Sequence, residues 1–200
     1  MTTTPMRVLL LAGSARQGAL SVRLRDAAAR LAQAAGASTS VLDLRALGLP
    51  LYDGDIEAGQ GVPQGAHQLR TAIAAHDAVL IVTPEYNGFP TPLVINAFDW
   101  LSRLPAGEGA ASGVMVTANK PTALLSISPG ALGGLRAMNF LRQYLQMAFG
   151  MLVLPRQHAV GHGHDVLDAQ GAFKDEKAEQ AVASVVHAVF RMAGALRTLG

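Results

Sequence analysis

The 200-residue chain contains no cysteine. Disulfide bridges, thiolate metal sites, redox chemistry at paired cysteines and a cysteine nucleophile are therefore excluded. Charged residues are also few, at 15% of the chain, and 16 lysines and arginines nearly balance 14 aspartates and glutamates. The small net charge of +2, with no basic block and no row of interleaved aromatic residues, predicts that the chain does not bind nucleic acid.

Long apolar stretches are missing as well. Runs such as Val8–Ala12 and Ala78–Val82 are far shorter than the roughly 20 residues that a membrane-spanning helix needs. The first residues carry one basic side chain and lead straight into a strand-like pattern, which differs from a signal peptide. We therefore expect no membrane association and a cytoplasmic location.

Half of the residues are hydrophobic, and a chain of this length can bury a core without disulfides or structural metals. We expect residues 1–200 to form a single domain. Met6–Ala12 is a nearly unbroken apolar run, which is typical of a parallel strand buried on both faces. From Leu20 the apolar residues recur every three or four positions up to Ala35, which predicts a helix that stops at Gly36.

The alternation of strand and helix continues along the chain. Loops are expected after residue 44 and over 161–171. Five strands alternate with five helices, and this pattern favours a doubly wound parallel sheet of order 2-1-3-4-5 with helices on both faces. Ligands of such sheets bind outside the carboxyl ends of the strands. The other four strands are expected at 39–44, 77–83, 122–128 and 151–154. The other four helices are expected in a segment of about a dozen residues that ends near His76 and at 93–104, 135–149 and 176–199.

The segment after the first strand is suited to a phosphate group. Free N–H groups at the start of a helix favour an anion, Ser14 and Ser21 add hydroxyl groups, and Arg16 adds a planar guanidinium. The pattern is neither GxGxxG nor GxxxxGK[ST], so a monophosphate fits better than a pyrophosphate or triphosphate. The alternative is that Ser21 only caps the helix and Arg16 is a solvated loop residue.

The segments after the third and fourth strands complete the predicted site. Thr83–Pro92 is stiffened by prolines and could aim backbone amides at a flat ring between Tyr86 and Phe89. Ser126–Gly134 contains several glycines, which allow a close approach of the backbone. The alternatives are a proline-rich turn before a helix and an ordinary strand-to-helix loop.

Other motifs are less specific. The histidines between His158 and Asp165 could be interpreted as a metal-binding tract, but a flexible glycine-rich exit from the last strand is the better interpretation, and we expect no metal site. The GxSxG pattern of a serine nucleophile is absent. Trp100 is expected in the core or in a subunit interface.

The motifs GSARQGALS, TPEYNGFPTPLVINAFDWLSR and SISPGALGGLRAMNFLRQYL, in this order and spacing, resemble the NADPH-dependent FMN reductase family of flavodoxin-like flavoproteins, which includes quinone, azo and chromate reductases. The resemblance covers roughly Arg7–Pro155. It implies a flavodoxin-like fold, in which the first motif holds the FMN phosphate, the second contacts the isoalloxazine and ribityl chain, and the third passes along the other edge of the ring. The FMN-binding residues implied in this way are Ser14, Arg16, Ser21, Pro84, Glu85, Tyr86, Asn87, Gly88, Ser126, Ser128, Pro129, Gly130 and Gly133.

The resemblance also implies an activity. Hydride would pass from NADPH or NADH to FMN, and a small acceptor such as a quinone, an azo compound, free flavin or a metal oxyanion would then take the electrons in a ping-pong cycle. No catalytic side chain is required. Glu85 and Arg136 sit where the family tends to build subunit contacts, which favours a homodimer or homotetramer. The alternatives are an electron-transfer module that serves a protein partner and a flavin-binding protein without turnover.

Overall fold

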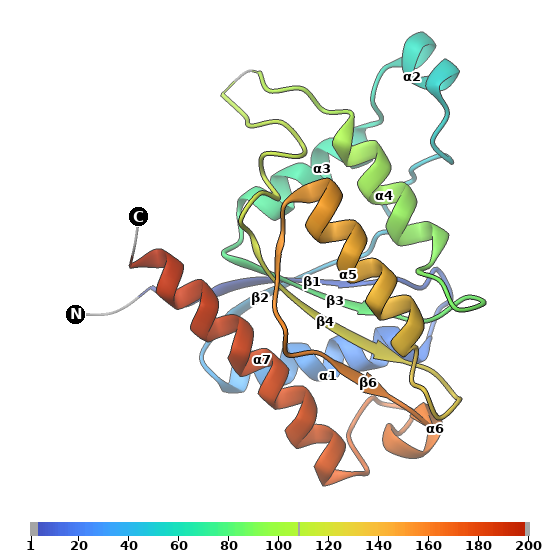
Figure 1. Cartoon of the computed structure of the whole chain (residues 1–200), viewed down its shortest axis with the longest axis vertical. Coiled ribbons are helices and arrows are strands. Elements are labelled where there is room, and N and C mark those ends of the chain that lie inside the picture. Colours follow the sequence, from blue (N-terminus) through green and yellow to red (C-terminus); the bar gives the residue numbers. More distant parts are fainter. Residues whose placement is uncertain (1–3, 108, 199–200) are drawn as a thin grey trace.

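A parallel sheet forms the centre of the computed structural model, which describes residues 4–107 and 109–198. The strands follow one another in the order β2-β1-β3-β4-β5, and β6 also pairs with β4 (Figure 1). The predicted order 2-1-3-4-5 is confirmed. The strands are β1 (Arg7–Ala12), β2 (Ser38–Leu42), β3 (Ala78–Thr83), β4 (Pro121–Ile127), β5 (Leu152–Val153) and β6 (His158–Val160).

Helices cover both faces of the sheet (Figure 1). The helices α1 (Leu20–Ala34) and α7 (Glu176–Arg197) pack on one face, and α3 (Gln64–Ala74), α4 (Pro92–Ser102) and α5 (Leu135–Phe149) pack on the other. Side chains of successive strand residues alternate between the faces, so a strand covered on both must be apolar throughout. This explains why the central strands have no polar alternation.

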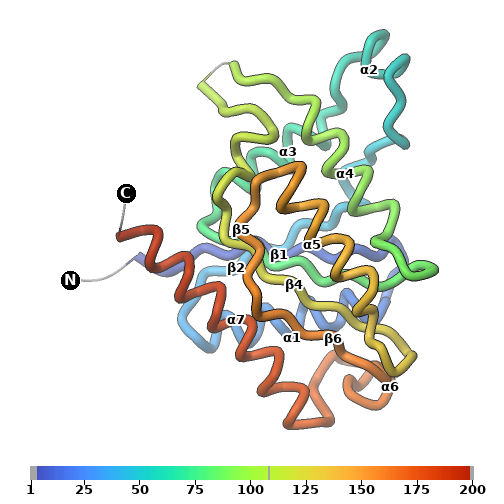
Figure 2. The backbone as a smooth tube through the Cα atoms, viewed as in Figure 1, coloured from blue at the N-terminus to red at the C-terminus, as the bar shows by residue number. Residues whose placement is uncertain are grey.

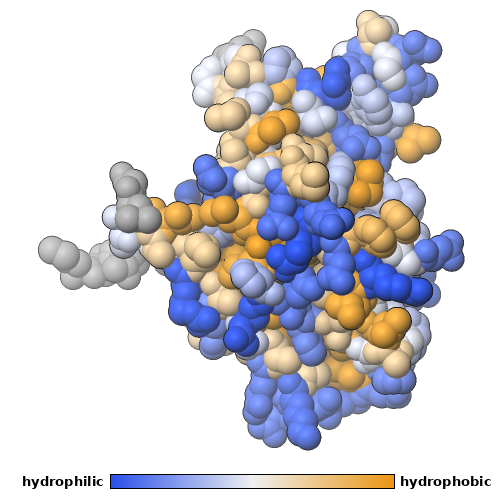
Figure 3. All heavy atoms as spheres, viewed as in Figure 1, coloured by the Kyte–Doolittle hydropathy of each residue, from blue (hydrophilic) through white to orange (hydrophobic). Residues whose placement is uncertain are grey.

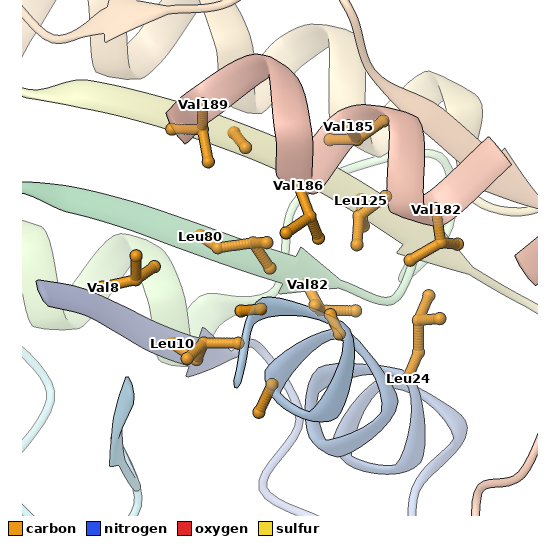
Figure 4. Close-up of a cluster of buried hydrophobic side chains, with 14 of the residues drawn as sticks. Val8, Leu10, Leu24, Leu80, Val82, Leu125, Val182, Val185, Val186 and Val189 are labelled. Carbon is orange, nitrogen blue, oxygen red and sulfur yellow. The ribbon is translucent and has the colours of Figure 1, made fainter. Parts of the chain in front are cut away.

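The core between the sheet and α7 shows this packing directly. In Figure 4 the valines of α7 lie against Leu80 and Leu125 of the sheet, and Leu24 of α1 approaches from beside them. All of these side chains are buried. Burial of apolar surface on both faces therefore holds the strands in place, and with them the loops that leave their ends.

At the edge of the sheet next to β4, we predicted one strand at 151–154, and the structure has two. Two short strands share it: β5 pairs with the start of β4 and β6 with its end. Figure 2 shows the backbone passing from β5 to β6 alongside β4. Pro155 has no N–H for a ladder, and Arg142 of α5 donates to the carbonyls of Val153 and Leu154 instead. The sheet consequently has six strands rather than the predicted five.

Two short helices lie in segments that the sequence analysis assigned to loops. The first is α2 (Gly54–Gln60), which begins where the Asp53 carboxylate accepts a hydrogen bond from the Asp55 N–H at 2.8 Å. The second is α6 (Gly163–Val166), in the segment 161–171. Gly163 packs closely here, since a Cβ on it would lie 2.7 Å from Ile127 and 3.0 Å from Leu20.

The carboxyl ends of β1, β3 and β4 point to the same edge of the sheet, on the right of Figure 1, and α6 lies beside them. Within the described ranges, no helix has the length and apolar character needed to cross a bilayer. Trp100 of α4 is fully buried and belongs to the core, as one of the two predicted alternatives had it.

Candidate functional site

A cavity of about 320 Å³ lies at this edge, which we call the edge cavity. Its volume is at the lower end of the range for ligand-binding sites. Residues from the loops after β1, β3 and β4 line it, together with the first two residues of α1, the last residue of β4 and one residue of α6. The lining consists of Ser14, Arg16, Ala19, Leu20, Ser21, Pro84, Glu85, Tyr86, Ile127, Ser128, Pro129 and His164.

The loops around the edge cavity are fixed to one another. The Thr91 hydroxyl, which is buried, donates to the Gly13 carbonyl at 2.5 Å and so joins the loop after β3 to the end of β1. Gly13 has no room for a side chain, because a Cβ would lie 2.9 Å from Val94 and 3.2 Å from Pro84. Such fixed loops present their backbone groups without a large ordering cost on binding.

The start of α1 has groups that an anion would satisfy. Ala19 is the residue before the helix and provides no side-chain cap. The Ser21 hydroxyl is 1% exposed, lines the edge cavity and has no hydrogen-bond partner among the described residues. A buried hydroxyl without a hydrogen-bond partner destabilises the folded state, and a ligand that forms a hydrogen bond with this hydroxyl would remove that cost.

Arg16 and Ser14 complete this end of the cavity. The Ser14 hydroxyl accepts a hydrogen bond from the Arg16 N–H at 3.2 Å. The Arg16 guanidinium is exposed and makes no hydrogen bond or ion pair with the part of the chain that the structure describes. Its charge is therefore not neutralised by any of the described residues, and its binding to an anion stays a prediction.

The loop after β3 forms the opposite side. Tyr86 and Phe89 exchange two backbone hydrogen bonds of 3.0 and 3.1 Å around a tight turn. The central residues Asn87 and Gly88 have φ values of 53° and 85°, a conformation that asparagine and glycine adopt most readily. The loop after β3 thus contains a tight turn, and Tyr86 of this turn lines the cavity and is 47% exposed.

Glu85 connects this loop to α5. Its carboxylate forms an ion pair with Arg136 and accepts a hydrogen bond from the Ala137 N–H at 3.3 Å. Gly134 provides no side-chain cap for α5, so Glu85 caps that helix from another loop. Burial raises the pKa of Glu85, but the hydrogen bonds from Arg136 and Ala137 outweigh burial and hold the pKa below its ordinary value.

This lowered pKa predicts an effect of acid. Because the folded-state pKa lies below the ordinary value of about 4.3, the stabilisation by Glu85 is complete above that pH and is lost as the pH falls through the lower, folded-state pKa. We expect Glu85→Gln to lower the free energy of unfolding at pH 7 and to narrow its difference between pH 7 and pH 3. Urea titrations at both pH values measure this.

The exposed residue Glu176 of α7 provides the matched control, since Glu176→Gln leaves the contact between Glu85 and Arg136 intact. This control should keep the wild-type difference between the two pH values. An unchanged difference in Glu85→Gln would show that the ion pair does not contribute.

The structure brings together only part of the predicted site. Ser14, Arg16, Ser21, Pro84, Glu85, Tyr86, Ser128 and Pro129 all line the edge cavity, whereas Asn87, Gly88, Ser126, Gly130 and Gly133 are not among its lining residues. Ser126 is fully buried, and its hydroxyl has no partner in the described ranges. Gly133 packs against β6, where a Cβ would lie 2.6 Å from the Val160 carbonyl carbon.

His164 lines the edge cavity and was not among the predicted site residues. The sequence analysis treated its segment as a possible metal tract, and no pattern in the sequence shows that α6 folds back against β4. The backbone does so through hydrogen bonds from the Gly163 N–H to the Ser128 carbonyl and from the His162 N–H to the Gly130 carbonyl. Across residues 4–107 and 109–198, no group of three or more His, Asp or Glu side chains is placed to hold a metal ion.

The residues around the edge cavity fit FMN. The lining includes the Ser21 hydroxyl and the Arg16 guanidinium, both without a side-chain partner among the described residues, and the start of α1, which has no side-chain cap; these groups are suited to a phosphate. Pro84, Tyr86 and Pro129 also line the cavity and offer flat or apolar surface to a ring. The carboxylate of Glu85 is paired with Arg136, so it does not leave an uncompensated negative charge beside an anionic ligand.

Comparisons with known proteins identify the family of the chain. The profile of the family described as NADPH-dependent FMN reductase matches residues 6–165. The chain is 34% identical to the NAD(P)H-dependent FMN reductase PA1204 of Pseudomonas aeruginosa over 92% of this chain and 93% of that protein. It is 36% identical to a quinone reductase of Escherichia coli over 74% of this chain and 73% of that protein.

A solved structure is similar over almost the whole chain. FerB from Paracoccus denitrificans, a flavoenzyme NAD(P)H:(acceptor) oxidoreductase, superimposes with a TM-score of 0.77 at 26% identity and covers 94% of this chain and 97% of its own. The family profile, the relatives and this likeness all lead to the same assignment. The chain belongs to the NADPH-dependent FMN reductase family, and its cofactors are FMN and NAD(P)H.

Proposed function

We propose that the chain is an FMN-dependent NAD(P)H oxidoreductase that passes electrons to a small acceptor by a ping-pong mechanism. The observation that carries the proposal is the edge cavity, whose lining includes the Ser21 hydroxyl and the Arg16 guanidinium, neither of which has a side-chain partner among the described residues. FMN bound there supplies the two-electron redox chemistry.

The chain's own residues bind and orient the cofactor. Ser14, Arg16 and Ser21 would hold the phosphate, with the Arg16 guanidinium neutralising part of its charge. Pro84–Gly88 and Ser128–Gly133 would flank the ring, and His164 is a further candidate contact from α6. No side chain of the cavity is required as a nucleophile or proton carrier for hydride transfer.

The ping-pong mechanism is proposed because one cavity must serve both substrates. Tyr86 lies exposed at its rim, so a nicotinamide and an acceptor would use the same open side in turn. Initial rates at several fixed quinone concentrations should give parallel double-reciprocal lines against NADPH. Intersecting lines would mean that both substrates bind together, and the proposed mechanism would be wrong.

A quinone is the first acceptor to test, because relatives at 36–40% identity carry the name quinone reductase. Azo compounds, free flavin and metal oxyanions are further candidates. Steady-state oxidation of NADPH with a quinone would separate this proposal from an electron carrier for a protein partner and from a flavin-binding protein without turnover, since neither alternative would sustain it.

Arg16→Ala is expected to weaken FMN binding by about 1.5–3 kcal/mol, the range for a hydrogen bond to a charged group. The reason is the loss of a positive charge that has no other partner among the described residues. Fluorescence titration of the FMN-free protein with FMN measures the change.

Arg156→Ala is the matched control for that titration, because Arg156 is exposed, lies outside the edge cavity and, within the described residues, makes one side-chain hydrogen bond, to the Ser184 hydroxyl at 3.4 Å. It should retain the wild-type affinity. Equal affinities of wild type and Arg16→Ala would remove Arg16 from the proposed site.

We also propose that two copies of the chain pair near the edge cavity. Phe89 and Phe140 stack with ring centroids 4.4 Å apart and remain 59% and 45% exposed, with Leu132 and Leu135 exposed nearby in sequence. Figure 3 shows apolar side chains interspersed with hydrophilic ones over the region of α5. Light scattering of the purified protein would test the predicted homodimer or homotetramer, and a monomer would contradict it.

Two further predictions from the sequence concern the number of domains and the location in the cell. Residues 1–200 are proposed to form one domain, which a single cooperative unfolding transition would support. The cytoplasmic location is likewise a proposal, and cell fractionation would test it.

A further inference from the structure

His164 of α6 lines the edge cavity, although α6 lies far along the chain from the loops that form most of the lining. The His164 side chain is exposed, and its imidazole makes no hydrogen bond or ion pair within the described ranges. Its backbone carbonyl, by contrast, accepts a hydrogen bond from the Lys174 ammonium at 2.7 Å. The ring nitrogens of His164 therefore keep their hydrogen-bonding capacity for a ligand of the cavity.

The segment that carries His164 is fixed to α1. The Arg23 guanidinium of α1 donates to the Asp168 carbonyl at 3.4 Å, and the Arg30 guanidinium donates to the Gly171 carbonyl at 2.5 Å. These contacts hold the backbone of the segment in place before any ligand binds. Binding to a side chain on a fixed backbone carries a smaller ordering cost than binding to a side chain on a mobile loop.

His164 also follows directly on a close contact with the start of α1. A Cβ on Gly163 would lie 3.0 Å from Leu20, the first residue of that helix, and 2.7 Å from Ile127, the last residue of β4. The next residue of α1 is Ser21, whose buried hydroxyl has no hydrogen-bond partner among the described residues. His164 and Ser21 thus line one cavity from two elements that touch each other, and the N–H groups at the start of α1 favour an anion.

The charges around His164 favour an anion over a cation. The Lys174 ammonium lies beside the His164 carbonyl, and Arg16 lines the same cavity without a carboxylate partner in the part of the chain that the structure describes. Glu85 is the acidic residue of the lining, and the ion pair described above compensates its charge. Asp165 follows His164 in the sequence but does not line the cavity.

We propose that the His164 imidazole donates a hydrogen bond to the phosphate of FMN and so adds a contact from α6 to those of the loop after β1. The inference rests on the proposed function, which places that phosphate at the start of α1. An imidazole has at least one N–H donor whether it is neutral or protonated, and a phosphate oxygen can accept from it. His164 is thereby a specificity residue, because riboflavin has the same ring and ribityl chain but no phosphate.

The alternative position for the imidazole is against the isoalloxazine ring. A contact with the ring would strengthen the binding of FMN and of riboflavin alike, whereas a contact with the phosphate strengthens the binding of FMN alone. A comparison of the two flavins therefore distinguishes the two positions.

The experiment titrates flavin-free protein with FMN and with riboflavin and follows the change in flavin fluorescence. His164→Ala should raise the Kd for FMN about tenfold and leave the Kd for riboflavin within about twofold of wild type. His164→Gln keeps an N–H donor, so its Kd for FMN should rise about threefold or less. His187→Ala is the matched control, because His187 is an exposed histidine of α7 outside the edge cavity, and it should bind both flavins as wild type does.

A second measurement uses the wild-type protein and does not depend on the folding of a variant. Inorganic phosphate is added to the flavin-free protein, and the nitrogen resonances of the histidine rings are followed by nuclear magnetic resonance. The ring signals of His164 should shift as phosphate is added, and those of His187 should stay in place. Phosphate that leaves the His164 signals unchanged, or shifts both rings alike, would contradict the proposed contact.

Two results with the variants would also overturn the inference. The first is an unchanged Kd for FMN in a His164→Ala protein whose circular dichroism matches wild type. The second is an equal loss of affinity for FMN and riboflavin, which would place the imidazole against the ring. The proposed function fails by a different sign, the absence of flavin binding and of NAD(P)H oxidation in the wild type. Normal oxidation of NADPH by the wild type, with an unchanged Kd for FMN in His164→Ala, would contradict only the role of His164.

Discussion

Replacing Gly133 by alanine is expected to lower the free energy of unfolding by about 2–6 kcal/mol, a large part of the usual stability of a domain. A Cβ at this position would lie 2.6 Å from the Val160 carbonyl carbon and 2.7 Å from the Gly161 nitrogen. Both are backbone atoms, so no side chain can rotate away. The φ value of 61° adds strain for any residue with a side chain.

The same substitution should weaken FMN binding. Relief of the contact would push the loop after β4 away from β6, and Ser128 and Pro129 of that loop line the edge cavity. Urea unfolding followed by circular dichroism and FMN titration would measure the two effects.

Gly130 of the same loop provides the control. A Cβ on Gly130 would meet only the Ser128 hydroxyl, at 3.9 Å, so Gly130→Ala should change stability by less than about 0.5 kcal/mol. If Gly130→Ala and Gly133→Ala were equally stable, the close packing of Gly133 on β6 would be wrong.

Trp100→Ala should lower the free energy of unfolding by about 3–5 kcal/mol. The Trp100 ring is fully buried and meets the Tyr52 ring edge to face with centroids 5.0 Å apart. Its Nε1–H donates to the Pro50 carbonyl at 2.7 Å, and Asn96 donates to the same oxygen. Truncation would leave a void in the core and loosen the contact of α4 with the segment around Pro50.

Urea titration would measure that loss of stability. The variant Trp100→Phe separates the contribution of core packing from that of the Nε1–H hydrogen bond. Phenylalanine keeps most of the apolar volume but removes the N–H donor, so we expect a smaller loss of about 1–3 kcal/mol. Losses of equal size in both variants would show that the hydrogen bond, and not the packing, dominates at this position.

The sheet could be predicted from the sequence because its signal is local. Apolar runs such as Met6–Ala12 alternate with helical periods, and the length of each connection fixes the crossover. The split of the last strand depends on the Arg142 side chain, which reaches the Val153 and Leu154 carbonyls from another element. Such a contact is not visible in the pattern of the strand itself. The start of α2 did have a signal, an aspartate cap at Asp53, within a loop rich in turn residues.

The site could be predicted to the extent that it depends on strand ends. Topology alone brings Ser14, Pro84 and Ser128 to one edge, whatever the details of the loops. The position of His164 at the cavity depends on how α6 folds back. The need for glycine at position 133 depends on how closely this residue packs on β6. Both are contacts between elements distant in sequence, so residue type and spacing do not determine them.

The central claim is that FMN binds in the edge cavity and exchanges electrons with NADPH. The most direct measurement is the visible absorption of the purified protein after incubation with FMN and removal of unbound flavin. We expect the bands of a bound oxidised flavin, their loss when NADPH is added without oxygen, and their return when a quinone follows. A protein that retains no flavin absorbance after this treatment, or whose bound flavin does not respond to NADPH, would contradict the account.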